Sequence, residues 1–222
     1  SQSWSVLSQA GQRDRARKAM DSAYKYLVME EESVSLLLTP PFYKTEKDPG
    51  YIKEYYPGIR ENGGQYTHAA VWLAIAAAMQ GDCERAYKLF TMLNPINSSR
   101  DREAALRYEK EPYVMTADVS YQAPYTGRGG WSWYTGSAGL MYQGLLKHFL
   151  GLHKEGDSFF ISPCVPEVFG DYTIRYRYKS STYLIEVKLL TDEAAAQEGN
   201  RIKLKDDGME HHIIIEKGCA KP

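Results

Sequence analysis

The sequence predicts an α+β fold, with a helical part over residues 1–150 and a small all-β part over 151–222. Apolar residues in the first part recur at intervals of three and four, which is the spacing of helices that bury one face. After Gly151, apolar and polar residues alternate as in strands. Two long glycine- and tyrosine-rich loops interrupt the helices. Helical hairpins with long loops at one end favour part of an α/α barrel, and an irregular helical bundle is the alternative.

The expected helices follow one another along the chain as hairpins. Gly11 ends the first helix, and Gly151 ends the last. The segment "THAAVWLAIAAAMQ" is almost wholly apolar and is expected to be buried, with Gly81 and Asp82 leading into its antiparallel partner. The predicted helices span residues 2–8, 14–31, 67–80, 83–93, 100–108 and 133–150.

The β part has strand character in "DSFFISPCVP", "DYTIRYRY", "STYLIEVKLL", "NRIKLKD" and "EHHIIIEKG". Glycine, proline and Asp207–Gly208 supply turn signals between these segments. His211 and His212 are neighbours on one strand, so their side chains point to opposite faces and make a poor metal pair. We therefore expect no metal site here.

Composition excludes several classes of partner. The net charge of −1 gives no basic excess for nucleic acid, and no apolar run is long enough to span a bilayer. Eighteen tyrosines suit sugars, although a polar-rimmed core explains them equally well. Three widely spaced cysteines indicate reduced thiols and a cytoplasmic protein. The opening "SQSWSVLSQAG" has the character of a helix end, so we expect a piece of a longer chain.

The stretch "RENGGQYTHAAVW" leads directly into the most apolar helix. Its two glycines permit a tight turn, and Thr67 is the better candidate for the helix cap. His68 then lies in the first turn, where backbone N–H groups and the helix dipole favour an anion. The alternative is a core histidine that hydrogen-bonds to a loop carbonyl.

The same stretch carries groups that suit a polyol. Glu61 beside Arg60 forms either a loop ion pair or a carboxylate aimed at sugar hydroxyls. Asn62 and Gln65 add amide donors and acceptors, which are common in sugar sites.

A second glycine-rich stretch, "GRGGWSWYTGSAG", also precedes an apolar helix. Thr135 offers a hydroxyl, and Gly136 lets an oxyanion approach the backbone. The alternative is a close helix crossing with Trp131 and Trp133 in the core. If both helices point their N-termini at one pocket, that pocket combines aromatic walls, a carboxylate, amides and an anion site.

These motifs resemble a known family. "PGIRENGGQYTHAAVW", "LNPIN", "EPYVMTADV", "GRGGWSWYTGSAG" and the later "ISPCVP" are similar to the inverting β-glucoside phosphorylases, and above all to the C-terminal module of cyclic β-1,2-glucan synthases. The resemblance implies an (α/α)6 barrel, here its C-terminal part, followed by a small sandwich-like β domain. It implies cleavage of β-glucan by inorganic phosphate, with inversion and release of α-glucose 1-phosphate, and no cofactor.

The resemblance also assigns roles to residues. It implies phosphate contacts for His68, Thr135 and Gly136, and sugar contacts for Glu61, Arg60 and Asp118. In some members the position of Arg60 holds lysine. Gln65 and Trp133 complete the expected substrate-binding set.

The catalytic aspartate of the family lies upstream of these motifs, and this chain carries no matching segment. We therefore expect the chain alone to be inactive, to need the rest of its parent chain, and to self-associate through exposed helix faces. Two alternatives stay open. One is a non-catalytic carbohydrate-binding or structural module, and the other is a related hydrolase with Glu61 as its base.

Overall fold

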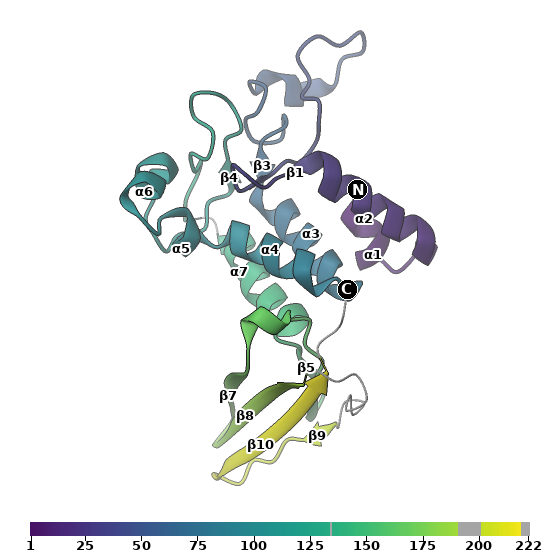
Figure 1. Ribbon diagram of the computed structural model, residues 1–222, viewed down its shortest axis with the longest axis vertical. Helices are drawn as coiled ribbons and strands as arrows, with labels where there is room; N and C mark the ends of the chain where they lie inside the picture. The colour runs from purple at the N-terminus through teal and green to yellow at the C-terminus, as the bar shows by residue number, and fades with distance from the viewer. Residues whose placement is uncertain (134, 191–200, 219–222) are drawn as a thin grey trace.

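The computed structural model describes residues 1–133, 135–190 and 201–218. Helices occupy the first part of the chain, and most of the strands gather at the opposite end of the molecule (Figure 1). The fold is therefore mixed α+β, as predicted. The helices are α1 (Gln2–Leu7), α2 (Arg13–Leu27), α3 (Thr67–Met79), α4 (Cys83–Leu93), α5 (Pro95–Ser98), α6 (Arg102–Tyr108) and α7 (Thr135–Gly144), with single turns η1 (Gly50–Glu54) and η3 (Glu167–Phe169) and the π-helical η2 (Leu145–Phe149).

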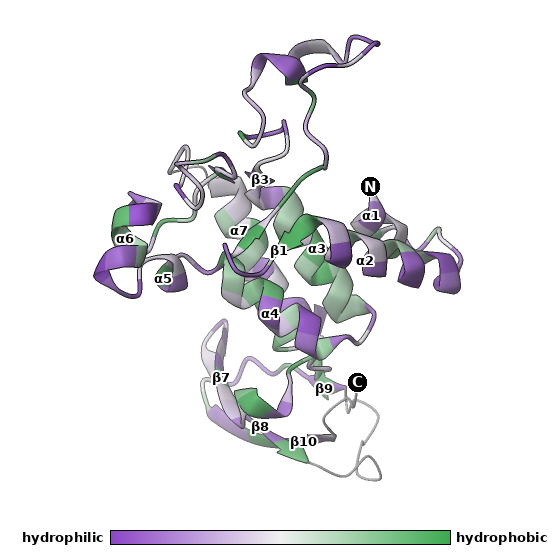
Figure 2. Cartoon of the chain, turned by 45° about the horizontal axis from the view of Figure 1, so that its top comes forward, coloured by the Kyte–Doolittle hydropathy of each residue, from purple (hydrophilic) through white to green (hydrophobic). Residues whose placement is uncertain are grey.

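The hairpin of α3 and α4 forms the centre of the helical part. Alanine dominates α3 and lets neighbouring helices approach it closely, so nearly every side of this helix is buried. Asp82 caps α4 by accepting a hydrogen bond from the Arg85 backbone N–H at 3.1 Å. Figure 2 shows the apolar residues gathered on α3, α4 and α7. The predicted bounds of this hairpin are confirmed almost to the residue.

The second helix is shorter than predicted. It ends at Leu27, and the chain turns into the two-stranded hairpin of β1 (Val28–Met29) and β2 (Val34–Ser35). Val28 is β-branched and extended, and it is buried by pairing opposite Ser35 rather than by continuing the helix. The expectation of a helix to residue 31 is therefore wrong.

The last helix begins later than predicted. Trp133 adopts a left-handed backbone with φ +66°, which no α-helix accommodates, and α7 starts at Thr135. Trp131 and Trp133 are 54% and 70% exposed, so the alternative that places them in the core is wrong. Near its end the helix widens into η2, and Phe149 packs against Phe90 with ring centres 5.4 Å apart.

The β part consists of two three-stranded sheets that share one core. In the first, β8 (Ser181–Leu190) lies between β7 (Tyr172–Tyr178), which is antiparallel, and β10 (Glu210–Gly218), which is parallel. In the second, β6 (Ser158–Ile161) lies between β5 (Leu152–Glu155) and β9 (Ile202–Lys203). Phe159 from β6 and Ile185 from β8 meet in the shared core. Strand β5 was not predicted, because Leu152 is its one strongly apolar residue and the segment therefore shows no alternation of apolar and polar residues.

Aromatic rings join the helical and β parts. Phe169 lies edge-on against Phe149 at 5.3 Å, and the Tyr172 hydroxyl donates to the Leu150 carbonyl at 2.7 Å. Cys164, which follows β6, shares the helical core with Cys83. No helix within the described ranges is long and apolar enough to cross a membrane.

Candidate functional site

A short β ribbon joins the two glycine-rich loops. Strand β3 (Gln65–Tyr66) pairs with β4 (Asp118–Val119), so that Tyr66 stands opposite Asp118. Residues 129–131 form a third extended segment beside β4. The Gly130 N–H donates to the Asp118 carbonyl at 2.8 Å, and the Ala117 N–H donates to the Trp131 carbonyl at 2.7 Å. Segments far apart in sequence thus meet at one end of the central hairpin (Figure 1).

Two helices begin where this ribbon ends. Strand β3 runs directly into α3, and α7 starts shortly after Trp131. A Cβ atom on Gly136 would lie 3.7 Å from His68 Nδ1, so His68 and the first turn of α7 are in contact distance. The structure brings His68, Gly136 and the neighbouring Thr135 together, as the sequence indicated.

The start of α3 differs from the prediction in one respect. Tyr66 is the capping position and makes no side-chain cap, whereas Thr67 is the first helical residue. The Thr67 N–H donates to the Ala117 carbonyl at 2.9 Å, so the ribbon satisfies this amide group. His68 packs edge-on against Trp72, with ring centres 5.0 Å apart. The imidazole is half-buried at the helix start, in contact distance of α7.

A charged cluster lies at the other end of the first loop. The Arg60 guanidinium carbon is 3.7 Å from the ring centre of Trp131, a cation–π contact. Arg60 Nε is 3.6 Å from Glu61 Oε2, and neither atom has a hydrogen-bond partner although both are buried. Buried polar atoms normally have a hydrogen-bond partner, so this loosely spaced ion pair is an unusual feature of the loop.

Asp118 lies next to this cluster and contacts Trp131. Its Oδ1 accepts a weak hydrogen bond from the Trp131 N–H at 3.4 Å, and burial raises its pKa, an effect that Arg60 partly offsets. A Cβ on Gly130 would lie 2.2 Å from Asp118 Oδ2. Glycine at residue 130 is therefore what lets the carboxyl group lie under the Trp131 loop.

Other expected sugar ligands have different surroundings. Asn62 is fully buried, and its amide binds the Phe42 N–H and carbonyl at 2.7 and 2.8 Å and the Tyr55 carbonyl at 2.8 Å. The Gln65 side chain is buried and accepts from the Ser35 N–H at 2.9 Å. Asn62 holds the loop together rather than facing a ligand. Gln65 pairs with Val119 and lies on the opposite side of the ribbon from Tyr66 and Asp118.

Trp133 also lies apart from the charged cluster. Its indole N–H donates to Glu111 Oε1 at 3.1 Å, and the ring is mostly exposed. The tryptophan that contacts Arg60 is Trp131, which sequence reasoning did not select. The only local signal was its place directly after "GRGG", where the chain is free to bend.

Ser137 is a second residue that sequence reasoning did not select. It lies in the first turn of α7, one residue after Gly136, and is 4% exposed. Its hydroxyl has no hydrogen-bond partner. This makes it a further polar group without a partner at the helix start where His68 lies.

Residues 1–151 match the catalytic domain of the glycosyl hydrolase 94 superfamily. This match covers more than half of the chain, and the chain therefore belongs to that superfamily. The resemblance to β-glucoside phosphorylases and cyclic β-1,2-glucan synthases is thereby confirmed.

Curated relatives agree with this assignment. The chain is 45% identical over 186 residues to the cyclic beta-(1,2)-glucan synthase NdvB of Rhizobium meliloti (strain 1021), covering 84% of this chain and 7% of that protein. It is 30% identical to the N,N'-diacetylchitobiose phosphorylase of Vibrio furnissii, covering 82% and 22%. It is 26% identical to the solabiose phosphorylase of Paenibacillus borealis, covering 97% and 29%. The chain thus spans less than a third of the length of these relatives.

Within the described part of the chain, no group of three or more His, Cys, Asp or Glu side chains could hold a metal ion. His211 stacks on Tyr183 and pairs with Asp207, whereas His212 pairs with Glu210. The two histidines therefore have separate partners.

Proposed function

We propose that this chain supplies the phosphate-binding and glucosyl-binding side of an inverting β-glucan phosphorylase site. The observation that carries the proposal is the meeting of His68 with the first turn of α7. The half-buried Arg60–Glu61 ion pair contacts Trp131, shortly before that helix begins. Phosphorolysis needs groups that bind an anion and groups that bind a polyol in one site. A module that binds only sugar does not need the anion-binding histidine and helix start.

The proposed roles follow from the chemistry of each group. His68 and the Thr135–Gly136 helix start hold inorganic phosphate, since imidazole and helix-start N–H groups donate to anions. Glu61 accepts hydrogen bonds from hydroxyls of the glucosyl unit at the cleaved bond, and Arg60 donates to them. Asp118 acts through Trp131 and Arg60, which it positions.

The proposed reaction is phosphorolysis without a cofactor. A phosphate oxygen attacks the anomeric carbon from one face, while the bond from that carbon to the glycosidic oxygen breaks on the other. A carboxylic acid gives its proton to the leaving oxygen. The products are α-glucose 1-phosphate and a glucan shortened by one unit. Phosphate takes the place of the water and base of an inverting hydrolase.

We place the proton donor outside these 222 residues, in an upstream region of the (α/α)6 barrel of a parent protein. On this proposal the isolated chain binds both ligands but releases no α-glucose 1-phosphate. The reaction belongs in the cytoplasm, where Cys83 and Cys164 stay reduced; both are free thiols here, which supports this compartment.

Calorimetric titration of the purified chain tests the proposal, with inorganic phosphate and a β-1,2-linked glucose disaccharide as probes. His68→Ala should abolish phosphate binding and leave the sugar affinity nearly unchanged. Glu61→Gln should do the opposite. His212→Ala, on the far β sheet, is the matched control for the histidine change. Phosphate affinity that survives His68→Ala would overturn the assignment.

A non-catalytic carbohydrate-binding module is the second candidate, because Tyr43, Tyr56, Trp131 and Trp133 are all more than half exposed. Exposed aromatic rings offer flat faces for sugar stacking. This reading requires sugar binding without any phosphate binding. The titration with phosphate therefore separates the two candidates.

A further inference from the structure

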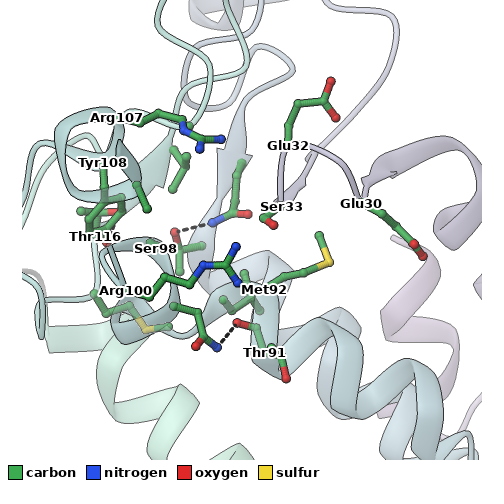
Figure 3. Close-up of a pocket in the computed structure, with 18 of the residues that line it drawn as sticks. Glu30, Glu32, Ser33, Thr91, Met92, Ser98, Arg100, Arg107, Tyr108 and Thr116 are labelled. Carbon is green, nitrogen blue, oxygen red and sulfur yellow. Dashed lines mark hydrogen bonds between the residues drawn. The ribbon is translucent and has the colours of Figure 1, made fainter. Parts of the chain in front are cut away.

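A cavity of about 470 Å³ lies behind the β3–β4 ribbon (Figure 3). Its walls come from the turn between β1 and β2, the C-terminal end of α4, α5, α6 and the loop before β4. Its size falls within the range of pockets that bind small molecules. The candidate site described above contributes a single predicted residue to it, Gln65.

The ribbon separates the cavity from the candidate site. Successive residues of a strand face opposite sides, and residues paired across two strands share a side. The paired residues Gln65 and Val119 line the cavity, whereas the paired residues Tyr66 and Asp118 do not. The ribbon is therefore one wall with two chemically different faces, and the two spaces are close neighbours.

The floor of the cavity is apolar and the rim is polar. Met92, Leu93, Met115 and Val119 are buried residues that line it. Ser33, Ser98 and Arg100 lie around the opening in Figure 3. An apolar surface bordered by hydroxyl and charged groups matches a sugar ring, which has apolar C–H faces and a rim of hydroxyls.

The cations of the lining are already compensated. Lys88 lies 2.9 Å from Glu30, Arg100 lies 3.4 Å from Asp101, and Arg107 lies 3.9 Å from Glu103. An anion would have to compete with these carboxylates, whereas a neutral polyol can bind to spare donors and acceptors of both partners. The lining therefore favours a neutral ligand over a phosphate or a carboxylate.

We propose that this cavity is an accessory binding site for a neutral oligosaccharide, which holds a distal part of the glucan chain whose end occupies the Arg60–Glu61 site. This inference rests on the proposed function for the identity of the sugar. The antiparallel hairpin of α3 and α4 explains why the cavity lies near the candidate site, since the start of α3 and the end of α4 lie at the same end of the hairpin. A short sugar reaches one space only, and a longer chain reaches both.

Two probes test the inference on the full 222-residue chain: a β-1,2-linked glucose disaccharide and a longer linear β-1,2-glucan oligosaccharide. Ser98→Trp fills the cavity, and Arg100→Ala removes a rim donor without touching the core. Arg102→Ala is the matched control, because Arg102 is exposed on α6 and does not line the cavity. Circular dichroism checks that each variant is folded.

The expected result separates the two sites. Ser98→Trp and Arg100→Ala should weaken binding of the longer oligosaccharide about tenfold, with no effect on the disaccharide. Glu61→Gln should weaken both probes. If both cavity variants bind the longer oligosaccharide as tightly as the unchanged protein does, the inference is overturned and the proposed function stands. Cavity variants that weaken binding while Glu61→Gln has no effect would instead overturn the proposed function. Phosphate binding that is lost in Arg100→Ala would show an anion site and overturn the neutral-ligand inference.

Discussion

Arg60 packs over the ring of Trp131, with its guanidinium carbon 3.7 Å from the ring centre. The two residues belong to loops that are separated in the sequence by four helices, α3 to α6. The loops are joined by the β3–β4 ribbon and by a hydrogen bond from the Tyr121 N–H to the Gly58 carbonyl at 2.7 Å. Arg60 also reaches Glu61, so one side chain connects an exposed aromatic ring to a half-buried carboxylate. The sugar side of the proposed site depends on this connection.

Replacing Arg60 by methionine should uncouple the two loops. The change removes the cation–π contact, worth about 0.5–2 kcal/mol, and leaves the Glu61 carboxylate without its ion pair. We expect altered tryptophan fluorescence and at least tenfold weaker binding of a β-1,2-linked disaccharide. Arg128→Met, which removes an exposed Arg128–Glu109 pair, is the control. Equal effects of the two changes on sugar binding would contradict the prediction.

Asp118→Asn should stabilise the fold at neutral pH. Burial raises the pKa of Asp118, so the folded state holds this proton more tightly than the unfolded state does. Stability therefore falls as the pH rises from the ordinary aspartate pKa, about 3.9, through the raised value. Asparagine keeps an oxygen that accepts from the Trp131 N–H, and it does not titrate, so the variant loses this dependence of stability on pH.

Urea unfolding of both proteins across the acid range measures this effect. The gain in free energy of unfolding from Asp118→Asn should be near zero below the ordinary pKa and should grow above it. Each unit by which the pKa is raised corresponds to about 1.4 kcal/mol, less what is lost with the attraction to Arg60. A difference that is constant with pH would count against the burial of this carboxyl group.

Two glycine-to-alanine changes should have opposite effects. In Gly130→Ala the new Cβ would lie 2.2 Å from Asp118 Oδ2, so the loop must move, and we expect a loss of stability of about 2 kcal/mol or more. Gly139→Ala in α7 meets no atom within 4 Å and should stabilise the helix by about 0.5–1 kcal/mol. Thermal unfolding of the two variants side by side checks both signs. Tolerance of alanine at residue 130 would mean that Asp118 does not lie under the loop.

Asn62→Asp should loosen the first loop. The asparagine amide donates to the Phe42 and Tyr55 carbonyls and accepts from the Phe42 N–H, and aspartate cannot donate. Two lost donor bonds and a buried charge should cost about 3 kcal/mol. Asn97→Asp is the control, because this exposed side chain donates once, to the Thr91 carbonyl at 2.9 Å. Limited proteolysis of residues 42–60 should accelerate in the first variant only.

The thiols of Cys83 and Cys164 should react slowly in the folded protein. Both are buried, and the neighbouring Cys83 thiol together with burial raises the pKa of Cys164. Thiol labelling in a Cys219→Ser background should therefore wait for unfolding, with two thiols modified per chain in denaturant. Rapid labelling under native conditions would contradict the burial of this pair.

Local signals predicted the central helices well. The apolar run of α3, the Asp82 cap and the Gly81 turn act within a few residues, so the sequence determines them directly. The ribbon has strands of only two residues, and its hydrogen bonds come from distant segments. For the same reason the parallel pairing of β10 with β8 left no local pattern.

The candidate site was predictable in part. His68 and Gly136 both follow glycine-rich stretches that enter apolar helices, and this shared pattern brought them together correctly. Asn62 shows the limit of such reasoning, since an amide in a glycine-rich loop serves equally well to bind a sugar or to hold the loop together. Only the buried position of its side chain decides between the two, and that position depends on Phe42 and Tyr55.

The alternation along β3 restricts the length of this segment as well as its composition. Inserting or deleting one residue between Gly64 and His68 would exchange the two faces, because side chains alternate along a strand. Gln65 would then turn toward the side of the ribbon where Asp118 lies, and Tyr66 toward the cavity behind the ribbon. Homologous proteins that use both spaces should therefore vary freely in the loop before Gly58, yet keep a constant number of residues across this ribbon.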